Sequence, residues 1–216
     1  MALIELSHRI TAGMITYPGI PGPELGVHLS REQSRDLYAP GTEFFIGTIT
    51  LAANTGTYLD SPYHRYAEGP DLTGVPLEKI ADLGGLVVAA QGLDAVDVSH
   101  LKDLDVAGKA VLIHTGWDVR FGTDAYFSGH PYLTGGAAAW LVGEGAALVG
   151  IDSLNIDSTP PAGSRPAHSA LLAAGIPIVE HLTNLGALPA SGFRFHAAPP
   201  MIAGMGTFPV RAYAVI

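Results

Sequence analysis

Short apolar stretches rich in β-branched residues recur along the chain and predict buried β-strands. The predicted strands are Leu3 to Leu6, Phe44 to Ala52, Leu86 to Ala90, Ala110 to His114, Ala147 to Asp152, Ile176 to Val179 and Val210 to Ile216. Between some of them the pattern changes to helical spacing. The predicted helices are Pro76 to Leu83, Asp97 to Leu104, Gly135 to Gly145 and Pro166 to Ala174. The alternation predicts an α/β fold with more strand than helix.

The chain of 216 residues is 48% hydrophobic and 14% charged, which suits one sizeable core. We therefore expect residues 1–216 to form a single domain. The 27 glycines and 16 prolines indicate many tight loops, and no loop segment is long enough to be an interdomain linker. The segment from Gly26 to Thr42, which carries several Arg and Glu residues, is predicted to be a mobile or partner-covered arm.

Composition and charge argue against several kinds of partner. No apolar run approaches the ~20 residues that span a bilayer, and the first residues, MALIELSHRI, do not have the pattern of a secretory signal. We therefore expect a cytoplasmic protein that does not bind membranes. A formal charge of −9, with 11 scattered Lys and Arg residues, argues against nucleic acid and favours a small-molecule partner. Because the chain has no cysteine, a metal ion would have nitrogen and oxygen ligands.

Two polar segments carry the candidate chemistry, since the usual motifs of serine hydrolases, zincins and nucleotide-binding loops are absent. The first is NTGTYLDSPYH at 54–64, and the second is RPAHSALLAAGIPIVEHLTNL at 165–185. In the second, His168 begins an apolar helix and Glu180 ends the strand after it, so the two side chains can lie together. A buried carboxylate requires a cation or an ion pair. For Glu180 the choice stays open between a metal ion and a salt bridge to Arg165, Arg194 or Arg211.

These segments resemble the cyclase family of hydrolases, which includes bacterial kynurenine formamidases and isatin hydrolases. The resemblance extends nearly end to end, through IELSHRITAGMITYPG, VLIHTGWD, YFSGHPYLT, LVGIDSLNID, HSALLAAGIPIVEHLTNL and PVRAYAVI. It implies the family's swivelling β/β/α architecture, a mixed sheet with flanking helices. It also implies a homodimer or tetramer in which loops of one subunit close the pocket of another. The implied activity is hydrolysis of a carbon–nitrogen bond in a small aryl or cyclic amide, with arylformamidase activity, a step of tryptophan catabolism, as the reference reaction.

The family signature H-x-G-T-H-x-D-x-P-x-H is only partly present, because Asn54 and Tyr58 replace two of its histidines. Neutral imidazole is a good ligand for zinc and manganese, whereas asparagine offers a weak carbonyl oxygen and tyrosine must lose a proton with a pKa of about 10. By resemblance, His64 is the general base or proton shuttle. The residues that the resemblance assigns to the metal are Asp60, His168 and Glu180.

Three outcomes of these substitutions stay open. One divalent cation, manganese or zinc, binds to the remaining ligands with help from Tyr58 or Asn54 and activates a water. Alternatively, Tyr58, His64 and Glu180 form an acid/base group that acts without metal. In the third outcome the protein is a non-catalytic small-molecule-binding homologue with a vestigial metal site.

The remaining residues of interest are aromatic and histidine side chains. An apolar slot for an aromatic or cyclic substrate is expected beside Asn54, with walls from Trp117, Tyr126 and Phe127. Structural roles are expected for His8, His100 and His181; His181 follows Glu180, so on a strand it would point to the opposite face. The roles of His114 and His130 stay open, and His114 ends a predicted strand near the expected pocket.

Overall fold

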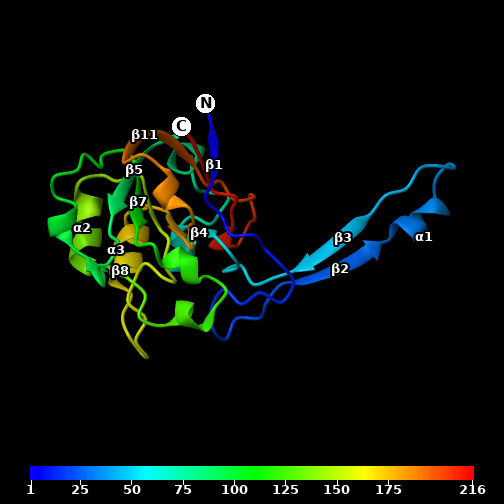
Figure 1. The fold of residues 1–216 in the computed structure, drawn as a ribbon, viewed down its shortest axis with the longest axis horizontal. Helices are drawn as coiled ribbons and strands as arrows, with labels where there is room; N and C mark the ends of the chain where they lie inside the picture. The colour runs from blue at the N-terminus through cyan, green and yellow to red at the C-terminus, as the bar shows by residue number, and fades with distance from the viewer.

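A mixed sheet of nine strands forms the centre of the protein in the computed structural model, which describes residues 1–216 (Figure 1). Four neighbouring strands run parallel, and the others are antiparallel to their neighbours. The order across the sheet is β1 (Leu3–Glu5), β13 (Tyr213–Val215), β11 (Ser191–His196), β5 (Leu83–Ala89), β7 (Ala110–His114), β9 (Leu148–Ile151), β10 (Ile178–Glu180), β4 (Tyr58–Asp60) and β12 (Thr207–Pro209). The parallel strands are β5, β7, β9 and β10.

Hydrophobic cores lie on both faces of the sheet. Helices α2 (Gly135–Gly143) and α3 (Pro166–Ala173) contact each other and contribute to the first core, together with Val111 and Ile113 of β7. Ala110 and Leu112 of the same strand belong to the second core, which contains the two phenylalanines of β11. Because both faces of β7 are buried, its sequence is an unbroken apolar run, as is typical of parallel strands.

Most predicted elements are present, and both long helices are confirmed. The other two predicted helices are wrong: Pro76 to Leu83 and Asp97 to Leu104 form only the single 3-10 turns η2 (Leu77–Lys79) and η3 (Val98–His100). Helices of this length depend on tertiary packing. Neither 3-10 turn has a buried residue, whereas α2 and α3 pack against each other. The sequence patterns missed β2 (Glu24–Leu29), β4, β11 and β12. Further short elements are β6 (Ala95–Val96), β8 (Tyr132–Leu133), η1 (Pro62–His64), η4 (Trp117–Arg120), η5 (Asp124–Phe127) and η6 (Leu185–Ala187).

A hairpin arm projects from the body of the protein (Figure 1). It consists of β2 (Glu24–Leu29), α1 (Arg31–Arg35) and β3 (Ile46–Thr50), and β2 and β3 pair only with each other. The predicted arm therefore exists and is longer than its predicted range. The expectation that Phe44 to Ala52 forms a buried strand is wrong, because β3 is exposed along its whole length.

No helix is both long and apolar enough to cross a membrane.

Candidate active site

The first polar segment forms strand β4, which lies between β10 and β12. Tyr58 is paired with Glu180, and Asp60 is paired with Thr207. Because alternate side chains point to opposite faces and Leu59 belongs to the second core, Tyr58 and Asp60 face the side on which α3 lies. All three residues of β4 are buried.

Asp157 fixes the position of His168. Its carboxylate accepts hydrogen bonds from the backbone N–H of Ala167 at 2.7 Å and of His168 at 2.9 Å, at the start of α3. It also lies 2.8 Å from Nδ1 of the His168 imidazole. Held in this way, Nε2 of His168 is 3.8 Å from Oδ2 of Asp60 and 3.6 Å from Oε1 of Glu180. The two polar segments thus meet in space, as the sequence predicted.

Thr207 connects His64 to Asp60. Its hydroxyl donates to Oδ1 of Asp60, and its oxygen lies 2.8 Å from Nδ1 of His64. Since that hydroxyl proton is already donated to a carboxylate, Thr207 accepts from Nδ1–H of His64. The other ring nitrogen, Nε2, then carries the lone pair. His64 is the most exposed side chain of this group, at 35%.

Asp60, His64 and His168 offer ligand atoms that all lie within 4.8 Å of one another. Oδ2 of Asp60 is buried and has no hydrogen-bond partner. Two ligands held at about 2.1 Å by one tetrahedral ion are separated by about 3.4 Å, which is close to the spacing between Asp60 and His168. A buried carboxylate oxygen without a partner is costly unless a cation compensates it. The residues therefore fit a divalent cation with nitrogen and oxygen ligands.

Glu180 is held by hydrogen bonds and has no arginine partner. Its Oε1 accepts from the backbone N–H of Ile156 at 2.6 Å, and its Oε2 accepts from the Tyr58 hydroxyl at 2.6 Å and from Nδ2 of Asn155 at 3.4 Å. The salt-bridge alternative is wrong, because the three arginines bind elsewhere. Arg165 donates to backbone carbonyls, Arg194 pairs with Asp82 and Arg211 pairs with Glu5.

Burial and the crowding of carboxylates shift the protonation of the metal-free site. Burial raises the pKa of Glu180 to about 7, and the nearby Asp60 adds to the rise while His168 opposes it. For His168, burial alone would lower the pKa, but the carboxylates of Glu180, Asp157 and Asp60 outweigh it and raise the pKa to about 10. Without a cation, an imidazolium therefore compensates the acidic groups.

His181 does not point away from the site, contrary to the expectation from strand alternation. Its backbone adopts a left-handed conformation with φ of 56°, which interrupts the alternation directly after Glu180. Nε2 of His181 lies 3.3 Å from the Tyr58 hydroxyl, and the imidazole is fully buried. Asn54 also lies beside the Tyr58 hydroxyl.

The three aromatic side chains that were expected to form one wall of a substrate pocket lie in different surroundings in the structure. Tyr126 is fully buried, and its hydroxyl lies 2.8 Å from Nδ1 of His181, so it packs behind Tyr58. Trp117 donates from Nε1 to the Tyr126 carbonyl and carries the Arg120 guanidinium 3.8 Å from its ring centre. Phe127 lines a separate cavity of about 440 Å³, together with His130. His114 lies away from the candidate ligands and contacts Gln91.

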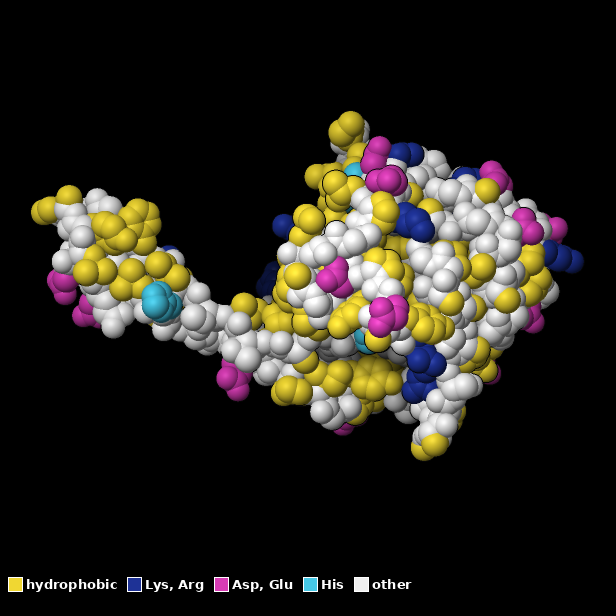
Figure 2. Space-filling view, turned by 180° about the vertical axis from the view of Figure 1, so that it is seen from behind, with side chains coloured by type: hydrophobic (Ala, Val, Ile, Leu, Met, Phe, Trp, Pro, Cys, Tyr) yellow, Lys and Arg dark blue, Asp and Glu magenta, His cyan; other side chains and the backbone are white.

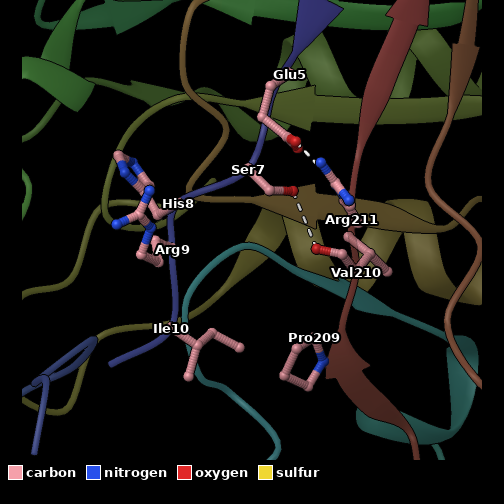
Figure 3. A pocket seen from close by; sticks show the side chains of 8 residues that line it. All are labelled: Glu5, Ser7, His8, Arg9, Ile10, Pro209, Val210 and Arg211. Carbon is pink, nitrogen blue, oxygen red and sulfur yellow. Dashed lines mark hydrogen bonds and ion pairs between the residues drawn. The ribbon is translucent and has the colours of Figure 1, made fainter. Parts of the chain in front are cut away.

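A cavity of about 590 Å³ lies near the first polar segment but contains none of the candidate ligands (Figure 3). Its lining comes from the end of β1 and the chain after it, and from the end of β12 and its link to β13. An ion pair between Glu5 and Arg211 and a hydrogen bond from Ser7 to the Val210 carbonyl lie along it (Figure 3). The charges nearest this cavity are thus partly neutralised by each other.

Four residues around the ligands could not be recognised as functional from the sequence: Asn155, Asp157, His181 and Thr207. Asp157 carried no capping signal either, because it lies well ahead of α3, whose N-cap position is Arg165. Thr207 belongs to a strand that the pattern missed. Asn155 and His181 are placed by backbone turns that follow buried strands.

Comparison with known proteins identifies the family to which the chain belongs. The Cyclase family model matches residues 4–158, and the chain belongs to the cyclase family. A kynurenine formamidase of Geobacillus thermodenitrificans is 30% identical over 213 residues, covering 97% of this chain and 95% of that protein. A kynurenine formamidase of Salinibacter ruber is 27% identical, covering 98% and 96% of the two chains.

Solved structures share the fold. Isatin hydrolase A from Ralstonia solanacearum superposes with a TM-score of 0.82 at 22% identity, covering 99% of this chain and 91% of the other. An isatin hydrolase bound to the product analogue thioisatinate gives a TM-score of 0.83 at 21% identity, with coverages of 99% and 92%. The expected fold, a mixed sheet with flanking helices as in the cyclase family, is confirmed.

Proposed function

We propose that the protein is an arylformamidase-like hydrolase that cleaves a carbon–nitrogen bond in a small aryl formamide or cyclic amide. Membership of the cyclase family and the kynurenine formamidase relatives support this class of reaction. The observation that carries the proposal is the buried, unpartnered Oδ2 of Asp60 beside Nε2 of His168, at 3.8 Å.

Asp60, His168 and Glu180 would hold one divalent cation, manganese or zinc. All three side chains are buried, and Nε2 of His168 lies 3.8 Å from Oδ2 of Asp60 and 3.6 Å from Oε1 of Glu180. When bound, such a cation lowers the pKa of a water toward ~7, so that hydroxide is available near neutral pH. Tyr58 is not a ligand in this arrangement, because its hydroxyl proton is donated to Glu180.

His64 transfers protons at the exposed side of the cluster. Thr207 holds its Nδ1–H, which leaves Nε2 able to take a proton from the attacking water and return it to the leaving nitrogen. This assignment separates two roles: the buried groups hold the cation, and the side chain that solvent and substrate can reach handles the proton.

Metal analysis of purified variants tests the assignment. Wild-type protein is expected to contain close to one equivalent of manganese or zinc per chain, and Asp60→Ala and Glu180→Ala are expected to lose it. His64→Gln should retain the metal and lose at least ~100-fold in the rate of formanilide or isatin hydrolysis, since general acid–base catalysis contributes 10²–10⁴-fold. Loss of metal from His64→Gln would make His64 a ligand. Full activity of metal-free protein would show an acid/base enzyme, and inertness of loaded protein would show a binding protein.

The arm supports a further part of the proposal, that the protein is a homo-oligomer. Half of the exposed large hydrophobic side chains of the chain lie on the arm, at 24–50. They are Leu25, Val27, Leu37, Tyr38, Phe44, Phe45, Ile46 and Ile49. In Figure 2 hydrophobic side chains cover much of the arm, which lies well away from the body.

A two-stranded hairpin has no core of its own and is marginal in water, so these side chains require a cover. A symmetric dimer lets each arm pack on the body of the other copy and covers both arms at once. We therefore propose a second copy of this chain as the partner of the arm.

A further inference from the structure

Behind the proposed ligands lies a continuous chain of buried hydrogen bonds. The Tyr126 hydroxyl is 2.8 Å from Nδ1 of His181, Nε2 of His181 is 3.3 Å from the Tyr58 hydroxyl, and that hydroxyl is 2.6 Å from Oε2 of Glu180. Tyr58, Tyr126 and His181 are at most 2% exposed. No step of the proposed reaction uses Tyr126 or His181.

The direction of each hydrogen bond follows from which groups can donate a proton and which can only accept one. An ionised Glu180 can only accept, so the Tyr58 hydroxyl donates to it. The Tyr58 oxygen must then accept from Nε2–H of His181, and Nδ1 of the same neutral ring accepts from the Tyr126 hydroxyl. The chain thus fixes one tautomer of His181, with the proton on Nε2.

The backbone holds His181 in this position at a conformational cost. Its φ of 56° is uncommon for a residue with a side chain. The His181 carbonyl accepts a hydrogen bond from the Thr57 hydroxyl at 2.6 Å, which ties it to the residue directly before Tyr58. The next residue, Leu182, donates its N–H to the Ile151 carbonyl at the end of β9. The surrounding structure therefore compensates the strain.

These contacts decide which atoms near Glu180 remain free for a cation. Oε2 of Glu180 accepts from Tyr58 and Asn155. Oε1 accepts one hydrogen bond, from the Ile156 N–H, and its second lone pair is available on the side where His168 lies, at 3.6 Å. The Tyr58 hydroxyl keeps its proton in the 2.6 Å hydrogen bond that it donates to Oε2 of Glu180. A neutral phenol that donates to a carboxylate presents no anionic oxygen to a metal, so the Tyr58 side of Glu180 has no vacant anionic ligand.

We propose that Tyr58 and His181 are positioning residues that orient the Glu180 carboxylate through hydrogen bonds and close its Tyr58 side to metal, so that the protein binds one divalent cation per chain. This inference rests on the proposed function in one respect, namely that Glu180 is a metal ligand. Groups that orient ligands in this way commonly contribute 10–100-fold to metal affinity.

Isothermal titration of metal-free protein with MnCl₂ tests the inference without an activity assay. Wild-type protein is expected to bind one manganese per chain. Tyr58→Phe keeps the ring and removes the hydroxyl, and it should weaken binding about 10–100-fold with the stoichiometry unchanged. His181→Gln keeps an N–H donor toward Tyr58 and should stay within about threefold of wild type, whereas His181→Leu should lose as much as Tyr58→Phe. Tyr58→His offers an imidazole ligand and should bind zinc more tightly than wild type.

The tautomer of His181 provides a second readout that needs neither metal nor a folded His181→Leu variant. In metal-free wild-type protein at pH 8, ¹⁵N spectra of the imidazoles should show a His181 signal with the proton on Nε2, as the hydrogen bonds to the Tyr126 and Tyr58 hydroxyls require. The signal is assigned by its loss in His181→Gln.

The outcomes separate the two proposals. Two manganese ions per wild-type chain, an unchanged affinity in Tyr58→Phe, or a His181 proton on Nδ1 would each overturn the positioning role and leave the hydrolase proposal intact. If wild-type protein binds no divalent cation, both the cation count and the metal-dependent function are wrong. One bound cation together with the expected Tyr58→Phe and tautomer results establishes the inference.

Discussion

The two oxygens of the buried Asp60 carboxylate have different surroundings. One oxygen accepts from Thr207, and the other has no partner and faces His168. The first contact fixes the orientation of the side chain, and the second leaves one oxygen available to a cation. Coordination by oxygen and imidazole without thiolate matches a chain that has no cysteine.

The same residues predict how the metal-free protein responds to pH. The pKa of His168 is raised from 6.5 to about 10, so its contribution to stability is complete below pH 6.5 and is lost as the pH rises toward 10. The pKa of Glu180 is raised from 4.5 to about 7, so its ionisation also lowers stability as the pH rises through that range. Both shifts act in the same direction, because the folded state binds the extra protons.

We therefore expect the metal-free protein, in the presence of a chelator, to melt at a lower temperature at pH 9 than at pH 6. Thermal unfolding followed by circular dichroism measures the difference. His168→Gln, which removes the titrating imidazole, should reduce it. A melting temperature that is equal or higher at pH 9 would contradict the expected protonation of the site.

At the scale of elements, the start of α3 depends on a residue outside the helix. Arg165, at the N-cap position, makes no side-chain capping bond, and the carboxylate of Asp157 takes that role. The same carboxylate holds the imidazole of His168. One buried aspartate thus couples the stability of the helix to the geometry of a metal ligand.

Asp157→Ala is expected to lower the free energy of unfolding by about 1–3 kcal/mol, because it removes a helix cap and leaves buried N–H donors without partners. Urea unfolding of metal-free protein measures this. Asp105→Ala is the matched control, since its ion pair with Lys109 is exposed to solvent and should contribute little to stability. Equal losses in the two variants would show that Asp157 has no special role.

At the scale of the whole molecule, the arm is the part that the rest of the chain does not stabilise. Its strands pair only with each other, and its apolar side chains are uncovered. Figure 1 shows the N- and C-termini close together at the edge of the body, well away from the arm. The arm is therefore free to reach a second copy without disturbing the central sheet.

Light scattering coupled to size exclusion is expected to show wild-type protein as a dimer or larger at micromolar concentration. Phe44→Glu combined with Ile46→Glu places two charges on the arm and should give monomers. Val119→Glu is the matched control, because Val119 is an exposed apolar residue of the body, and it should leave the oligomer unchanged. A monomeric wild-type protein would refute the proposed role of the arm.

The sequence alone determined the α/β class, the buried core strands and the two long helices. Buried strands such as β7 are continuous apolar runs because both of their faces are covered, and this pattern is local. The meeting of Asp60, His168 and Glu180 also followed from the sequence, through resemblance to a family that this chain belongs to. The roles of these three residues remain predictions.

The tertiary structure alone decided which groups surround those ligands and that the arm stands apart from the central sheet. The left-handed backbone of His181 reversed the direction that strand alternation predicts for its side chain. Thr207 and Asp157 reach the ligands only because strands and turns far apart in the chain have a particular register. The apolar pattern of β3 predicted burial, yet within one chain it pairs with β2 alone. Contacts between distant segments determine the register of the strands, the sign of φ at His181 and which surface covers a strand such as β3. Local hydrophobic patterns do not encode these features.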